Sequence, residues 1–328
     1  MTSETVSDEL RSHCRIVRRE LREGKIIPFL GAGANLCGRP EGVDWLKDSY
    51  LPDGVELARY LNDLYFDPTG SSPELIRVSQ YIDSLVGGDA LYRALRRAFN
   101  KQYQPNALHR LLADIPAAVR RWREEGEEDA SFQLIVTTNY DDALEQAFTA
   151  ASEEYDLVTY VAQGENFGKF IHRPPGGEPR LIYDPSTDRG LSLKERTAIL
   201  KIHGAIDRQD SDRDSYVITE DNYINYLARS NIANFIPAAL MGPMKESHFL
   251  FLGYSLADWN LRVILQRIWG ATNFQQPFTS WAIQRNPSQL EKTMWDNRHI
   301  KILDVDIAEY VSAVRRLALT RDGEVPPA

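Results

Sequence analysis

Hydrophobic and polar positions at the start of the chain follow two successive patterns. Between residues 8 and 23, apolar side chains recur among charges at spacings near three to four, which predicts an amphipathic helix. Residues 26–30 then read Ile-Ile-Pro-Phe-Leu, an uninterrupted apolar run typical of a strand buried on both faces. The first expected unit is therefore a surface helix that leads into a buried strand.

A long helical block follows this strand. Residues 51–123 carry apolar side chains at helical spacing, in groups such as Leu57 with Leu61, Leu91 with Leu95, and Leu108 with Leu111. Strand-like runs lie before and after this block. We therefore predict that residues 51–126 form an inserted helical subdomain.

Short apolar runs return after the helical block, at residues 132–138, 157–161, 181–183, 199–202, 249–252, 280–283 and 300–305. Helical patterns follow several of them, at 141–148, 257–269 and 306–319. This alternation predicts an α/β fold: a Rossmann-like, mostly parallel sheet with helices on both faces. We assign residues 1–50 and 127–319 to it and 320–328 to a tail. The Gly- and Pro-rich stretch 164–189 is expected to be surface loop, although the run 181–183 falls within it.

Composition narrows the possible functions. The chain has 328 residues and a net charge of −9, which disfavours direct nucleic-acid binding. Its two cysteines, Cys14 and Cys37, cannot make a disulfide framework or a four-cysteine zinc module, and we expect no bound metal. The first ten residues are polar, and no apolar run reaches membrane-spanning length. We expect a cytoplasmic protein.

Small, polar or titratable residues follow four of the predicted strands. In open α/β sheets, ligands bind outside the carboxyl ends of the strands, so these residues are expected to converge on one site. The four groups are Gly31-Ala32-Gly33-Ala34-Asn35, Thr137-Thr138-Asn139-Tyr140-Asp141-Asp142, His203-Gly204 and Gly253-Tyr254-Ser255. The paired glycines after an apolar run favour a loop that accepts a phosphate.

Each group also has a purely structural interpretation. A Gly-x-Gly can be only a tight turn, and Leu36 stands where the dinucleotide fingerprint needs a third glycine. His203 could bond a backbone carbonyl. Asn139 could cap a helix that begins at Tyr140, and Asp142, Ser255 and Asp258 could serve helix N-termini. We expect His109 to be a packing or surface residue, His172 to lie in a loop, Trp45 to pack, and 220–226 to begin an exposed helix.

The ordered set Gly-Ala-Gly-Ala-Asn, Thr-Thr-Asn-Tyr-Asp, Lys-Ile-His-Gly and Leu-Gly-Tyr-Ser resembles the sirtuin family over residues 26–269. Deacylating sirtuins carry four zinc-binding cysteines and a Phe-Arg pair after the glycine loop, both of which this chain lacks. It is more similar to the sirtuin-like (SIR2-like) NADases of bacterial anti-phage defence. The resemblance implies that NAD+ is the substrate. It assigns Gly31, Ala32, Gly33, Asn35, Thr138, Asp141, Gly253 and Ser255 to binding, and Asn139 and His203 to catalysis.

These residue types suit cleavage of the nicotinamide–ribose bond. The sugar develops oxocarbenium character while nicotinamide leaves as a neutral base, so the reaction needs an oriented ribose and a base more than an acid. Asn139 can hydrogen-bond ribose or water, His203 can accept a proton, and Asp141 could hold the carboxamide. We therefore expect an NAD+ glycohydrolase that depletes NAD+ during phage infection.

Such an activity has to be gated, because a constitutive NADase would be toxic. Little of the chain lies outside the predicted catalytic fold, so we expect homo-oligomerisation, or a separate sensor such as a HerA-like translocase ATPase or a short Argonaute. The alternatives are a non-hydrolytic module that binds NAD+ or ADP-ribose, and a protein deacylase or ADP-ribosyltransferase. A hydride-transferring dehydrogenase is least favoured, because the glycine spacing differs from its fingerprint.

Overall fold

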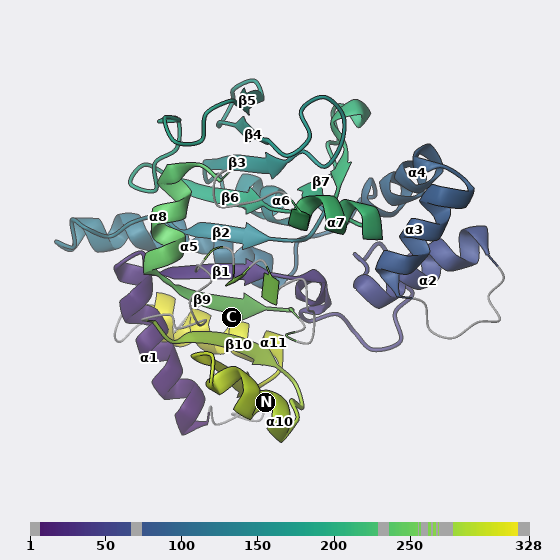
Figure 1. The fold of residues 1–328 in the computed structure, drawn as a ribbon. Helices are drawn as coiled ribbons and strands as arrows, with labels where there is room; N and C mark the ends of the chain where they lie inside the picture. The colour runs from purple at the N-terminus through teal and green to yellow at the C-terminus, as the bar shows by residue number, and fades with distance from the viewer. Residues whose placement is uncertain are drawn as a thin grey trace.

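A computed structural model describes residues 7–66, 74–228, 236–254, 256, 262, 263, 265, 266, 268 and 278–320. Within these residues the main element is a nine-stranded sheet with strand order β11-β10-β9-β1-β2-β6-β3-β4-β5 (Figure 1). Its strands are β1 Ile26–Leu30, β2 Leu134–Thr137, β3 Tyr155–Tyr160, β4 Phe170–Arg173, β5 Arg180–Ile182, β6 Thr197–Lys201, β9 His248–Leu252, β10 Ser280–Gln284 and β11 Ile300–Asp304.

Every neighbouring pair from β11 to β3 is parallel, and the two antiparallel pairs, β3 with β4 and β4 with β5, lie at one edge of the sheet. The central strands β1, β2 and β6 are buried along their whole length, as expected for a parallel sheet covered on both faces. The predicted mostly parallel α/β fold is confirmed.

One segment differs from the sequence prediction. The stretch 164–189, expected to be loop, contains β4, which buries Phe170 and His172, while β5 agrees with the apolar run predicted at 181–183. Alternate residues of β4 are buried, but the strand is only four residues long and lies among glycines and prolines. A period-two pattern that short is hidden in the sequence, so the prediction of loop was wrong there, and His172 is in a strand.

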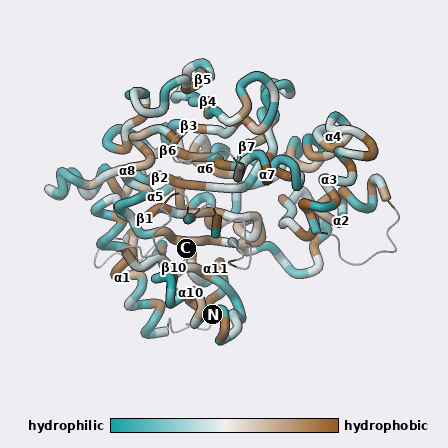
Figure 2. Tube along the Cα trace, in the orientation of Figure 1, coloured by the Kyte–Doolittle hydropathy of each residue, from teal (hydrophilic) through white to brown (hydrophobic). Residues whose placement is uncertain are grey.

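Helices cover both faces of the sheet. One face carries α1 Asp8–Arg22, α5 Ala107–Glu124, α6 Ala143–Ala150 and α11 Ile307–Val314, which continues as the π-helical turn η4 Arg315–Leu319. The other face is covered by α7 Glu220–Ala228, α8 Ala238–Glu246 and α10 Gln289–Asp296. Hydrophobic residues lie along the central strands between these two layers (Figure 2). The helix expected at 257–269 falls largely outside the described residues.

The helices α2 Gly54–Tyr65, α3 Leu75–Leu85 and α4 Gly88–Phe99 stand beyond the carboxyl ends of the strands (Figure 1). They enclose a third hydrophobic core that includes Leu61, Ile82 and Leu95. The helix α5, which the predicted insert also contains, packs with α6 and α11 on the sheet instead. The division into domains stays a prediction.

Two short strands, β7 Gly204–Ala205 and β8 Ser215–Tyr216, pair just beyond β6, and a 3-10 turn, η2 Ser211–Arg213, lies between them. Another 3-10 helix, η1 Ala32–Leu36, follows β1 directly. None of the helices in the described part of the chain is long and apolar enough to cross a membrane.

Candidate active site

The glycine loop after β1 is locked to the end of β9. The backbone N–H of Gly31 donates to the carbonyl of Leu252 at 3.1 Å, and that of Gly33 to Gly253 at 2.8 Å. A Cβ on Gly253 would lie 1.9 Å from the backbone nitrogen of Ala34, and the φ of Gly253 is +65°. Only glycine fits this crossing, which explains the small residues at both strand ends. The loop continues through Ala32 into η1.

Asn35, at the end of this loop, joins it to the segment after β2. Its side-chain Nδ2 donates to the carbonyl of Pro52 and to Oδ2 of Asp141, both at 3.2 Å. The other carboxylate oxygen of Asp141 accepts the N–H of Ala143 at 3.1 Å, at the start of α6. Asp141 is therefore already engaged on both oxygens, and its carboxylate orients the loop at least as much as it faces the cavity.

Thr138 and Asn139 follow β2. The N–H of Thr138 continues the sheet by donating to Leu30 at 3.1 Å, and the N–H of Asn139 is fixed by the hydroxyl of Thr137 at 3.0 Å. The Asn139 side chain is 8% exposed, and its Oδ1 has no hydrogen-bond partner among the described residues. A buried amide oxygen left in this state is suited to a ligand.

His203 follows β6 and is 2% exposed. Burial lowers the pKa of its imidazole from 6.5 to about 3, so the ring is neutral at physiological pH. Its Nδ1 lies 3.5 Å from the hydroxyl of Tyr223, while its Nε2 is buried and has no hydrogen-bond partner within the described residues. The arrangement provides a neutral proton acceptor in a desolvated place.

Nine of the ten predicted site residues line one cavity of about 1350 Å³ between the strand ends and α2. They are Gly31, Ala32, Gly33, Asn35, Thr138, Asn139, Asp141, His203 and Gly253. The tenth, Ser255, lies outside the described residues, as does Asp258. The structure thus brings the four strand-end groups together, while the roles of the individual residues stay predictions.

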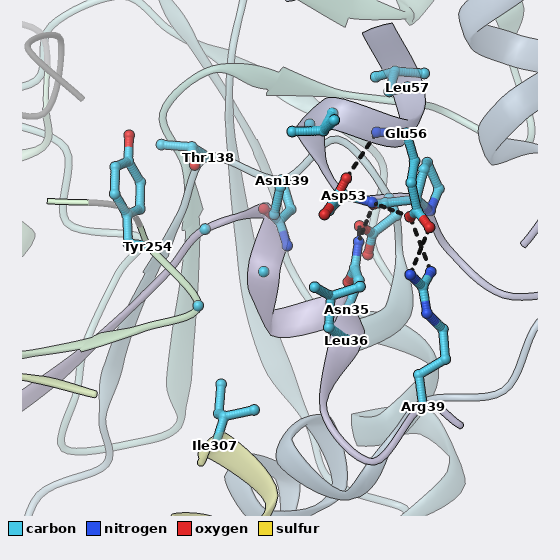
Figure 3. Close-up of a pocket in the computed structure, with 18 of the residues that line it drawn as sticks. Asn35, Leu36, Arg39, Asp53, Glu56, Leu57, Thr138, Asn139, Tyr254 and Ile307 are labelled. Carbon is cyan, nitrogen blue, oxygen red and sulfur yellow. Dashed lines mark hydrogen bonds and ion pairs between the residues drawn. The ribbon is translucent and has the colours of Figure 1, made fainter. Parts of the chain in front are cut away.

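Sequence reasoning missed a charged cluster on the cavity wall. The guanidinium of Arg39 binds both carboxylate oxygens of Glu56, at 2.6 and 3.0 Å (Figure 3). It also donates to the carbonyl of Leu51 at 3.1 Å. Glu56 also closes a capping box with Asp53 at the start of α2. The Asp-x-x-Glu spacing was visible in the sequence, but the partner of Arg39 is decided by the fold.

A buried lysine holds the segment after β2 through a hydrogen bond to its backbone. Lys201, at the end of β6 and 1% exposed, donates from Nζ to the backbone carbonyl of Asp141 and lies 2.6 Å from Oε1 of Glu145. Burial raises the pKa of the Glu145 carboxyl, while Lys201 opposes that shift. The lysine connects the strand that carries His203 to the loop that carries Asn139.

Several alternative interpretations are now decided. The helix α6 begins at Ala143 rather than at Tyr140, and Asp141, not Asn139, bonds its first N–H. Asp142 occupies the N-cap position of α6, as expected, but its carboxylate makes no capping hydrogen bond and binds the guanidinium of Arg208 at 2.6 Å. His109 is a buried packing residue, Trp45 is buried in the third hydrophobic core, and α7 does begin at Glu220. However, Tyr223 and Tyr226 are buried against His203 rather than exposed.

Comparison with known proteins agrees with this geometry. A family model described as a SIR2-like domain matches residues 133–303. The chain is 30% identical over 256 residues to the NAD(+) hydrolase ThsA of Acinetobacter baumannii (strain 532279), covering 77% of this chain and 41% of that protein. It is 27% identical over 261 residues to ThsA of Enterococcus faecium, covering 78% and 43%. The chain thus spans about two fifths of the length of the relatives it matches.

Proposed function

This chain belongs to the SIR2-like domain family, and from that premise we propose that it is an NAD+ glycohydrolase that releases nicotinamide and ADP-ribose. The observation that carries the proposal is a pair of buried polar atoms without a hydrogen-bond partner in the described part of the chain, Oδ1 of Asn139 and Nε2 of His203, from two residues that line one cavity beside the glycine loop. The names of the relatives, which are NAD(+) hydrolases, support the same substrate.

In this proposal the glycine loop and Gly253, which line the cavity, hold the diphosphate. Asn139 orients the ribose or the attacking water through its amide. His203, kept neutral by burial, accepts the proton of that water as it adds to the developing oxocarbenium ion. The bond between nicotinamide and the anomeric carbon breaks, its electrons leave with the neutral nicotinamide, and the water oxygen replaces it.

The test is NAD+ consumption with separation of nicotinamide and ADP-ribose for wild type, Asn139→Ala and His203→Gln. Loss of a general base should lower kcat by roughly 100- to 10,000-fold. His109→Gln is the matched control, because His109 is equally buried and also has a lowered pKa but does not line the large cavity. Calorimetric binding of NAD+ without turnover in wild type, unchanged by protein concentration or by the proposed sensor proteins, would favour the binding-module alternative and contradict the hydrolase.

We further propose that the enzyme acts in the cytoplasm as the NAD+-depleting effector of an anti-phage system, gated by assembly or by a separate sensor such as a HerA-like ATPase or a short Argonaute. The resemblance to defence NADases and the toxicity of an ungated hydrolase support this. Gating by assembly is tested by measuring specific activity against protein concentration, together with molecular mass by light scattering. Constant specific activity across a change of oligomeric state would contradict it.

A further inference from the structure

Two tyrosines of α7 pack their rings against the imidazole of His203. Tyr223 and Tyr226 lie three residues apart and therefore on one face of the helix. Their ring centroids are 5.4 and 5.5 Å from that of His203, and both rings stand at 89° to it. The two rings together fix the plane of the imidazole, and both side chains are buried.

The two tyrosines differ in their relation to the polar edge of the ring. The hydroxyl oxygen of Tyr223 lies 3.5 Å from Nδ1 of His203, and Tyr223 also lines the cavity. A contact of this length is a weak hydrogen bond, of the kind that tightens when a substrate closes an active site. The Tyr223 hydroxyl is thus close enough to Nδ1 to accept a hydrogen bond from a proton on that nitrogen.

The protonation of the ring follows from the role of its other nitrogen. A neutral imidazole carries one proton, so Nε2 can act as a base only when that proton is on Nδ1. A buried N–H needs an acceptor, and the Tyr223 hydroxyl is an oxygen within reach of Nδ1. Resting on the proposed hydrolase function, we propose that Tyr223 is a positioning residue whose hydroxyl oxygen accepts the Nδ1 proton of His203 and leaves Nε2 unprotonated at the cavity.

The insert holds the tyrosine in this place. Gln80 of α3 donates from Nε2 to the carboxylate of Asp221 at 2.9 Å, and its Oε1 accepts the backbone N–H of Asp221 at 3.0 Å. Both hydrogen bonds are made to the first turn of α7, two residues before Tyr223. The inserted helices therefore set the position of the helix that positions His203.

The first test is spectroscopic and needs no turnover. Protein labelled with 15N in its six histidines is examined by long-range 1H–15N correlation, and the His203 signals are assigned by their loss in His203→Gln. The proposal requires the Nδ1–H tautomer in wild type, and a shift toward Nε2–H in Tyr223→Phe. An Nε2–H tautomer in wild type, or the same tautomer in both proteins, overturns it even if the protein proves not to hydrolyse NAD+.

The second test is kinetic. Tyr223→Phe keeps the ring contact and loses the hydroxyl, so kcat should fall about tenfold or more while KM for NAD+ changes little. Tyr226→Phe is the matched control, since its ring packs on His203 in the same geometry, and it should retain kcat. Equal losses of kcat in the two variants would overturn the proposal, because they would show that the Tyr223 hydroxyl has no specific effect at Nδ1. A wild type that hydrolyses no NAD+ at any protein concentration, with or without the proposed sensor proteins, would refute the proposed function while leaving the tautomer result interpretable.

Discussion

At the scale of single residues, the crossing of the glycine loop and the end of β9 decides which side chains the site tolerates. Gly253 and Gly38 both line the cavity and have similar positive φ values, +65° and +69°. Only Gly253 faces backbone, however, because a Cβ at Gly38 would meet nothing within 4 Å. The two positions therefore separate the effect of backbone conformation from that of close packing.

We predict that Gly38→Ala lowers the free energy of unfolding by only about 1–2 kcal/mol, the strain of a left-handed residue. Gly253→Ala should cost more than about 4 kcal/mol or prevent folding, since Ala34 must move to admit the new methyl group. Urea denaturation of both variants provides the measurement. Similar midpoints would show that the β9 end can shift away from the loop at little cost.

At the scale of elements, the buried Lys201–Glu145 pair connects β6, α6 and the segment after β2. Removing one partner leaves the other as a buried charge, which typically costs several kcal/mol, whereas neutralising both does not. Lys201 also binds the carbonyl of Asp141. Neutralising both partners should therefore restore stability but not activity, whereas removing Lys201 alone should lower both.

Lys201→Met should lower the free energy of unfolding by about 3–5 kcal/mol, and adding Glu145→Gln should recover most of that loss. NAD+ hydrolysis should stay low in the double variant, because the carbonyl of Asp141 still lacks its donor. Lys292→Met is the control, since Lys292 and Asp304 form an exposed pair 3.4 Å apart. Full recovery of kcat in the double variant would show that the active site does not need the contact between Lys201 and the carbonyl of Asp141.

At the scale of the whole molecule, three buried histidines make stability depend on pH. Burial lowers the pKa of His13 and His109 to about 4 and that of His203 to about 3, against 6.5 for an ordinary histidine. The unfolded chain therefore binds more protons than the folded one below pH 6.5. Their contribution is complete above pH 6.5 and is lost as the pH falls from there toward 4.

A histidine such as His109, with a pKa of 6.5 in the unfolded chain and about 4 in the folded protein, should make the protein about 1.4 kcal/mol less stable at pH 5.5 than at pH 7.5. His109→Gln should remove that share of the loss, since glutamine can keep the capping contact that the His109 ring makes with the N–H of Asn106 at 3.2 Å. Urea denaturation of both proteins at the two pH values measures the difference, and carboxyl titrations common to both cancel. An unchanged pH dependence would mean that His109 has the same pKa in the folded and the unfolded protein.

The sequence by itself determined the fold class and most of the candidate site. Parallel strands bury both faces, so their apolar runs stand out, and the residues that end them must meet at one edge of the sheet. Tertiary structure alone decided that Arg39 pairs with Glu56, that Lys201 supports the segment after β2, and that Tyr223 meets His203. These partners are separated by 17 to 60 positions, and each pair depends on which buried or partly buried polar groups the packed fold brings within hydrogen-bond distance. Apolar periodicity is local and can be seen in the sequence, whereas the pairing of buried polar groups depends on the whole fold.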